Sequence, residues 1–180
     1  METVNVLTRP RYVRTVRQLH WWMAALILLA YLLIDFHEYF PREVRRAMMQ
    51  GHFWAGITVF LLVWWRISSR ARGGTPAIKP PLGSLAVVAS RLMHLALYAF
   101  FIVMPVLGFL TASYEGKQVK IPFLGIALPS PVAVDDAFGH RLEDIHATIG
   151  TVFYWVIGLH VAVALWHHFI RRDNVLERML

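Results

Sequence analysis

The sequence predicts an all-α membrane protein built as a bundle of four transmembrane helices. Of its 180 residues, 57% are hydrophobic, and the mean hydropathy of +0.50 is too high for an ordinary soluble domain of this length. Four apolar segments recur along the chain, and each provides, with its flanks, the roughly 20 residues that a membrane-crossing helix needs. We predict one domain spanning residues 1–180, with helices at about 16–35, 48–68, 90–112 and 142–170.

The first apolar segment follows a basic arm and has no small-residue cleavage site, so we expect a retained helix and not a signal peptide. Phe40-Pro41 ends this first unit, and a short amphipathic lead-in precedes the second helix. The breaker-rich run from Gly73 to Pro81 predicts a loop, because irregular backbone is not stable in lipid.

Pro105 lies within the third apolar segment and predicts a kinked helix. The connection from Ser113 to about Arg141 is the longest, and its three prolines predict an irregular cap lying on the bundle. The fourth helix ends at the basic pair Arg171-Arg172.

The charge distribution predicts how the bundle lies in the membrane. The chain has 18 Lys and Arg against 11 Asp and Glu, for a net charge of +7. If both termini and the second connection share one side, that side holds twelve of the 18 basic residues. The positive-inside rule then places both termini in the cytoplasm, with the protein in the bacterial inner membrane. Because topology explains this basicity, we predict no nucleic-acid partner; the expected partners are membrane lipid and small redox molecules.

The chain contains no cysteine. This excludes disulfides, thiolate metal sites, iron–sulfur clusters and covalently attached haem.

Four histidines recur at two levels of the predicted bundle. His146 and His160 are 14 residues apart on the fourth helix, which places them on one face and about 21 Å apart along its axis. Because successive helices alternate in direction, His20 lies at the cytoplasmic level and His52 at the periplasmic level. We therefore predict that His20 pairs with His160, and His52 with His146.

Two facing imidazoles are the simplest way for a helix bundle to hold a haem iron, so each pair predicts one non-covalent b-type haem. Glycines one helical turn from the ligands would clear space for the flat macrocycle, namely Gly56 and Gly150, with Gly158 and Gly108 in similar positions. A zinc site is the competing metal interpretation, but its ligands would have to converge at one depth. Two haems at two depths predict electron transfer across the membrane.

Further residues are candidates for contacts with the cofactors. Arg17, Arg66 and Arg91 are predicted partners of haem propionates on the cytoplasmic side, with Arg45 or Arg46 on the other side, because a guanidinium binds a carboxylate through two hydrogen bonds. His94 and His167 are candidates for a quinone pocket beside the cytoplasmic haem, where they would exchange protons. His168 is expected at the membrane interface, and His37 and His140 in solvent-exposed outer loops.

With these residues assigned, the sequence resembles the bacterial cytochrome b561 family over nearly its whole length. The resemblance rests on the order of Gln18-Leu19-His20-Trp21, Tyr39-Phe40-Pro41-Arg42, Gly51-His52 to Gly56, Leu92-Met93-His94 to Tyr98, His146-Ala147-Thr148 to Gly158-Leu159-His160, His167-His168 and Arg172-Asp173-Asn174. It implies a four-helix bundle in the inner membrane, two b haems held by the four histidines, and a quinone near the cytoplasmic end.

Within that family the chain is most similar to short members that pass electrons from superoxide to ubiquinone. The resemblance therefore implies a superoxide:quinone oxidoreductase. One feature departs from this pattern, because the outer side has a net charge of −2, whereas an anion-collecting surface is expected to be electropositive. Two other functions stay open: an anchor subunit that relays electrons from a dehydrogenase or hydrogenase to quinone, and a haemless transporter, although the chain lacks the inverted repeats usual in transporters.

Overall fold

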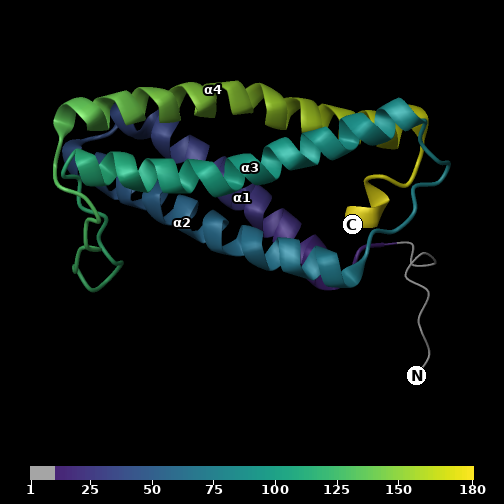
Figure 1. Ribbon diagram of the computed structural model, residues 1–180, viewed down its shortest axis with the longest axis horizontal. Helices are drawn as coiled ribbons and strands as arrows, with labels where there is room; N and C mark the ends of the chain where they lie inside the picture. The colour runs from purple at the N-terminus through teal and green to yellow at the C-terminus, as the bar shows by residue number, and fades with distance from the viewer. Residues whose placement is uncertain (1–10) are drawn as a thin grey trace.

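The computed structural model describes residues 11–180. Arg9, which belongs to the predicted basic arm, lies outside the described residues. Four long helices run side by side along one axis (Figure 1): α1 at Arg14–Phe36, α2 at Arg42–Gly73, α3 at Ser84–Tyr114 and α4 at Asp136–Trp166. All four are long and apolar enough to cross a membrane. The predicted four-helix membrane bundle is therefore confirmed.

The first three helices extend beyond their predicted bounds, and α4 begins before its predicted start but ends at Trp166, where a π-helical turn takes over. The differences are largest in α2, predicted at 48–68, and at the starts of α3 and α4, predicted at 90 and 142. Arginine and serine are tolerated in helices, so the polar turns at the membrane surface continue the apolar helix instead of forming loops. α2 ends where Gly74 adopts φ 70°, a left-handed conformation that favours glycine, and donates its N–H to the Arg70 carbonyl at 3.1 Å. Only residues 74–83 remain as the connection to α3.

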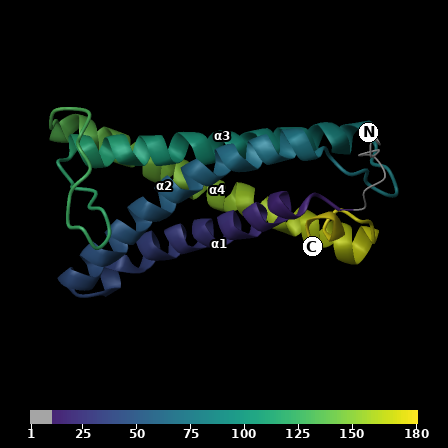
Figure 2. The same cartoon turned by 90° about the horizontal axis from the view of Figure 1, so that it is seen from below.

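The helices pack as two hairpins. α1 packs along α2, α3 packs along α4, and α2 joins the two hairpins by packing against α3, whereas α1 and α4 approach each other closely at few positions (Figure 2). Small clusters fill the seams, such as Met23 with Val59 and Val63, and Phe100 stacked on Phe153 with ring centroids 3.9 Å apart. Many outward-facing apolar side chains on all four helices are exposed, as expected for surfaces that contact lipid.

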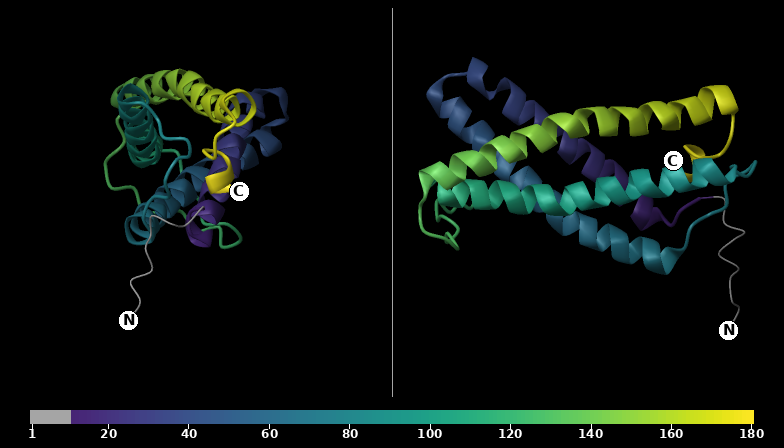
Figure 3. Two further views of the ribbon diagram at one scale, coloured as in Figure 1. Left: turned by 90° about the vertical axis from the view of Figure 1, so that its right-hand side faces the viewer. Right: turned by 45° about the horizontal axis from the view of Figure 1, so that its top comes forward.

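The two ends of the bundle differ in how they are covered. At the end that holds both the start of α1 and the C-terminus, residues 173–180 fold back over the helices (Figures 1 and 3). There, Tyr12 donates its N–H to the Arg178 carbonyl at 3.0 Å, and the buried Arg178 donates to the Pro76 carbonyl at 2.7 Å. We call this the termini end. It carries a short π-helical turn at His167–Arg171, which continues α4.

The opposite end carries a 3₁₀ turn at His37–Tyr39 and the long connection between α3 and α4. We call it the loop end. The long connection is held against the start of α2, because Gln50 accepts the Lys120 N–H at 2.8 Å and donates to the Gln118 carbonyl at 2.7 Å. It is an irregular, hydrogen-bonded cap of the predicted kind. Pro105 lies inside α3, which continues unbroken on both sides of it.

Candidate functional site: two histidine pairs in the bundle

The four histidines predicted as haem ligands meet in two pairs across the bundle. At the loop end, His52 of α2 faces His146 of α4 with ring centroids 6.2 Å apart and ring planes at 78°. At the termini end, His20 of α1 faces His160 of α4 at 6.4 Å and 75°. Both pairs lie between helices of different hairpins, where backbone packing leaves room.

The spacing within each pair fits a metal ion held from two sides. A metal–imidazole nitrogen bond is about 2 Å long, and that nitrogen lies about 1 Å from the centre of its ring, so two opposed ligands place their centroids about 6 Å apart. The pairs at 6.2 and 6.4 Å match this spacing. In contrast, two histidines that bonded directly to each other would stand closer, because an N–H···N bond is only about 3 Å long.

The His52–His146 pair opens into a cavity of about 340 Å³ with mostly apolar walls. Its size is within the range of protein cofactor pockets. Three glycines line it, one each from α2, α3 and α4, namely Gly56, Gly108 and Gly150. A Cβ at Gly108 would lie 2.9 Å from His146 Cε1, so this glycine is required for the observed position of the ring. The cavity thus combines two facing imidazoles with the glycine-lined space that a flat macrocycle needs.

The hydrogen bonds of this pair leave nitrogen lone pairs free for a metal. His52 Nδ1 lies 2.9 Å from the Ala30 carbonyl oxygen, to which it donates, so Nε2 carries the free lone pair. His146 Nδ1 is buried and has no hydrogen-bond partner among residues 11–180. The neutral imidazole of His146 therefore keeps a nitrogen lone pair that is available to a metal. The residues of the loop-end pair therefore fit a b-type haem.

At the termini end, a third histidine joins the pair. His94 of α3 lies with its ring centroid 5.8 Å from that of His160, and it donates from Nδ1 to the Ser90 carbonyl at 2.6 Å. The sequence placed His94 near this pair as a quinone-site residue; direct contact with His160 was not anticipated. Three imidazoles from α1, α3 and α4 thus converge at one level.

Of the predicted propionate partners, Arg66 lies nearest to these histidines. Arg66 belongs to α2, and its side chain is buried close enough to His20 and His160 for electrostatic interaction. Its nearest polar partners are weak, with the Tyr98 hydroxyl at 3.4 Å and the Val16 carbonyl at 3.5 Å, and it forms no ion pair within residues 11–180. A buried guanidinium without an anion is unfavourable in lipid, so this position fits a bound carboxylate.

The other predicted arginines have different surroundings. Arg17 donates to the Leu180 carbonyl in the folded-back C-terminal segment, and Arg91 is exposed on α3. At the loop end, Arg45 reaches the Glu38 carbonyl at 3.4 Å, and Arg46 is exposed.

His167 is not in the same cluster as His94. It is buried in the π-helical turn, where Nδ1 donates to Asp173 Oδ2 at 2.5 Å, and Arg171 Nε lies 2.9 Å from the same oxygen. The ion pair was not predicted, because Asp173 follows the helix and its direction could not be inferred from spacing. His168 is half-buried, with its Nδ1 enclosed.

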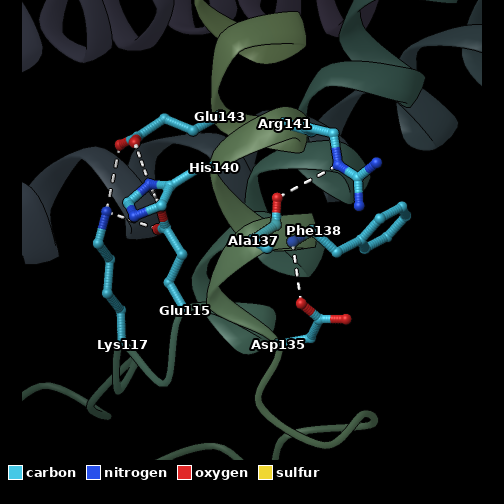
Figure 4. A network of polar contacts seen from close by, with 8 residues as sticks. All are labelled: Glu115, Lys117, Asp135, Ala137, Phe138, His140, Arg141 and Glu143. Carbon is cyan, nitrogen blue, oxygen red and sulfur yellow. Dashed lines mark hydrogen bonds and ion pairs between the residues drawn. The ribbon is translucent and has the colours of Figure 1, made fainter.

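Each histidine assigned to an exposed outer loop differs from its prediction in one respect, His37 in its exposure and His140 in its element. His37 is half-buried in the 3₁₀ turn after α1, and its Nδ1 lies 2.6 Å from the Ile34 carbonyl. His140 is exposed, as expected, but belongs to α4, because this helix begins at Asp136 and not at residue 142. The earlier start has a local cause: Asp135 caps the helix by accepting the Phe138 N–H at 3.0 Å (Figure 4).

Sequence reasoning missed two polar groups. In the loop-end cavity, Tyr31 of α1 donates to the Gly150 carbonyl at 2.9 Å, and Tyr154 of α4 donates to Asp35. At the termini end, the Tyr98 hydroxyl accepts from both Arg66 and Arg70. The tyrosines in the apolar segments could have indicated these polar contacts, because a buried hydroxyl needs a hydrogen-bond partner.

Charged side chains line the loop-end cavity at its entrance. They are Asp35, Glu115, Lys117 and Glu143. Burial by itself lowers the pKa of Lys117, but the hydrogen bonds and negative charges of Glu115 and Glu143 outweigh it, so that this pKa is raised and the ammonium persists. Three carboxylates against one ammonium leave the entrance negative, in agreement with the net charge of this side.

Comparison with known proteins gives the family. The sequence model described as prokaryotic cytochrome b561 matches residues 11–180. Cytochrome b561 homolog 1 of Escherichia coli K12 is 31% identical over 172 residues, which cover 94% of this chain and 97% of the relative. The probable superoxide oxidase CybB of Yersinia pestis is 30% identical over 162 residues, covering 90% and 91%. Cytochrome b561 homolog 2 of Escherichia coli K12 is 30% identical over 118 residues, covering 66% and 60%.

The family match at residues 11–180 extends over all four helices and both histidine pairs. Membership brings with it the general properties of the family, which are a multi-pass membrane location, a b-type haem and electron transfer. The chain belongs to the prokaryotic cytochrome b561 family.

Proposed function

We propose that this protein carries two b haems, one at each histidine pair, and passes electrons across the membrane from superoxide to ubiquinone. The proposal rests on the two pairs of facing imidazoles, whose ring centroids are 6.2 and 6.4 Å apart and which lie at different levels along α4. Their ligands on α4 are 14 residues apart, which corresponds to about 21 Å along the helix.

A b-type haem, when bound, supplies a one-electron carrier at each level. His52 and His146 would hold the haem of the loop end, and the bond from His52 to the Ala30 carbonyl fixes the orientation of its ligand ring. His20 and His160 would hold the haem of the termini end. The buried Arg66 would neutralise a propionate there, which also compensates its own charge. The apolar walls of the bundle keep water away from the path between the levels.

For the acceptor, we propose that ubiquinone binds at the termini end beside His94. Full reduction of a quinone requires protons as well as electrons, so a histidine at this place has a chemical role. His94 contacts His160 through ring edges, and its Nδ1 is fixed on the Ser90 carbonyl. His167, oriented by Asp173, would exchange protons between this end and the adjoining solution.

For the donor, superoxide is proposed because the relative in Yersinia pestis is named a probable superoxide oxidase and is similar along 91% of its length. We place this step at the loop end, which the positive-inside rule assigns to the periplasm. The inner membrane as location and cytoplasmic termini are part of the proposal.

The test begins with the haem b content per polypeptide of the detergent-purified protein, from which two haems per chain are expected. Quinone reduction is then followed with a superoxide-generating system, with and without superoxide dismutase. The proposal requires reduction that the dismutase abolishes. Two haems without superoxide-dependent quinone reduction would contradict the donor and favour the alternative of an anchor subunit that takes electrons from a protein partner.

A further inference from the structure

A cluster of ligating side chains outside the histidine pairs is shown in Figure 4, and two of its members, Glu115 and Glu143, also line the loop-end cavity. The cluster consists of Glu115, which directly follows α3, and His140 and Glu143, which lie in the first turns of α4. One ligand atom from each of the three lies within 4.8 Å of the other two. His140 Nδ1 is 3.3 Å from Glu115 Oε1 and 3.5 Å from Glu143 Oε2. The end of α3 and the start of α4 therefore fix the relative positions of the three ligands.

The carboxylate of Glu115 is buried and aimed into this cluster. Its side chain is only 3% exposed, and within residues 11–180 its two oxygens are met by the side chains of Lys117 and His140. Gly139 lets α4 approach this close, since a Cβ there would lie 2.6 Å from Glu115 Cγ. Lys117 Nζ lies 2.6 Å from Oε2, and His140 Nδ1 approaches the other oxygen. Burying a carboxylate is costly unless a cation compensates it.

The charges of the cluster are not balanced. Lys117 lies between the two carboxylates, 2.6 Å from Glu115 and 3.2 Å from Glu143. Two carboxylates and one ammonium leave one negative charge when His140 is neutral. A divalent cation in the place of the ammonium would bring the charge of the three ligands to zero.

We propose that Glu115, His140 and Glu143 bind a divalent cation of the zinc type, which displaces the ammonium of Lys117. One imidazole nitrogen and two carboxylates form a three-ligand set that suits Zn²⁺, with water as the fourth ligand. Mg²⁺ and Ca²⁺ prefer oxygen ligands only, so they bind more weakly here. Binding does not depend on the proposed function; an effect of the cation on electron entry at the cavity would depend on it.

Isothermal titration of the haem-loaded protein in detergent with ZnCl₂, and separately with MgCl₂, tests the proposal. We expect one saturable Zn²⁺ site and no comparable Mg²⁺ binding. The His140→Gln variant should bind Zn²⁺ at least about 10-fold more weakly, because even the loss of a side chain that only orients a ligand costs about 10–100-fold. The Lys117→Gln variant should bind more tightly, because it removes the competing cation. His37→Gln is the matched control, since this histidine lies at the same end but outside the cluster.

Three results would overturn the proposal: no saturable Zn²⁺ binding, binding that His140→Gln leaves unchanged, or binding that Lys117→Gln weakens. Haem content measured on the same samples keeps this test separate from that of the proposed function. Zn²⁺ binding that is lost in His52→Gln but kept in His140→Gln would place the ion in the histidine cavity and would also reject the site.

Discussion

At the scale of single residues, the termini end offers three imidazoles where a haem needs two. His20 and His160 stand at 6.4 Å and His94 and His160 at 5.8 Å, and both distances are close to the spacing of about 6 Å for two opposed ligands. His94 donates from Nδ1 to the Ser90 carbonyl, as His52 does to the Ala30 carbonyl. The proposed function assigns His20 as the ligand and His94 to the quinone, and variants of the two residues separate these roles.

We therefore expect His20→Gln to lose one of two haems, while His94→Gln keeps both and slows quinone reduction about 100-fold or more, the lower end of the usual contribution of proton-transfer catalysis. The measurement is the reduced-minus-oxidised spectrum with haem content per chain, followed by the quinone assay. Loss of a haem in His94→Gln with retention in His20→Gln would exchange their roles.

Gly108 is the residue on which the shape of the loop-end cavity depends most directly. Its missing side chain leaves room for the ring of His146, and even a methyl group would come within 2.9 Å of Cε1. Larger side chains would force the ring out of line with His52, because packed interiors accommodate added volume poorly.

Gly108→Val should therefore lower the haem content from two to about one per chain, with the haem of the termini end retained. Haem content and the loss of one spectral component measure this. Gly83→Ala is the control, because a Cβ at that position meets nothing within 4 Å. A Gly108→Val protein that keeps both haems would show that the cavity does not hold the macrocycle in the proposed place.

At the scale of elements, α1 and α4 depend on side chains for their association. Their backbones approach at few places, and two hydroxyl bonds span the gap near the loop end, from Tyr31 to Gly150 and from Tyr154 to Asp35. The two tyrosine rings also pack together with centroids 4.2 Å apart. In a bilayer, where lipid competes equally for apolar surface, such polar bonds are a main source of helix association.

Removal of one hydroxyl tests this. Tyr31→Phe should destabilise the protein by about 1 kcal/mol, because the ring packing stays while the bond to the Gly150 carbonyl is lost. The shift is measured by thermal unfolding in detergent, with Tyr39→Phe, whose side chain is largely exposed after α1, as the matched control. Equal melting temperatures for the two variants would mean that the hydroxyl bond does not hold this seam.

At the scale of the whole molecule, charge separates the two ends. The termini end is strongly basic, which is the charge that the positive-inside rule expects of the side proposed as cytoplasmic, while three carboxylates and one ammonium line the cavity entrance at the loop end. An anionic donor such as superoxide would therefore reach this entrance without electrostatic attraction.

This predicts an unusual salt dependence. Reduction of the protein by superoxide should become faster, by less than about 10-fold, when ionic strength rises from 0.01 to 0.15 M, since the Debye length falls from about 30 to about 8 Å and repulsion is screened. Rapid-mixing measurements of haem reduction test this, with a neutral quinol as a salt-insensitive control. A rate that falls with salt would mean that basic residues away from the entrance steer the donor.

The sequence was sufficient to predict the four spans and the two levels of histidines. Hydropathy determines which segments enter lipid, and the fixed rise of an α-helix determines that residues 146 and 160 lie on one face at different depths. Alternating helix direction then assigned His20 and His52 to opposite ends. These inferences needed only local geometry.

Tertiary structure decided what depends on neighbouring helices. The contact of His94 with His160, the burial of Arg66 beside Tyr98 and the meeting of Glu115 with His140 each join residues far apart in sequence. The bounds of the helices also came only from the structure, because the polar turns of α2 and α3 and the cap at Asp135 carry no hydropathy signal. The physical reason is that hydropathy and helical periodicity act along one chain segment, whereas the partner of a buried polar group is set by how the segments pack.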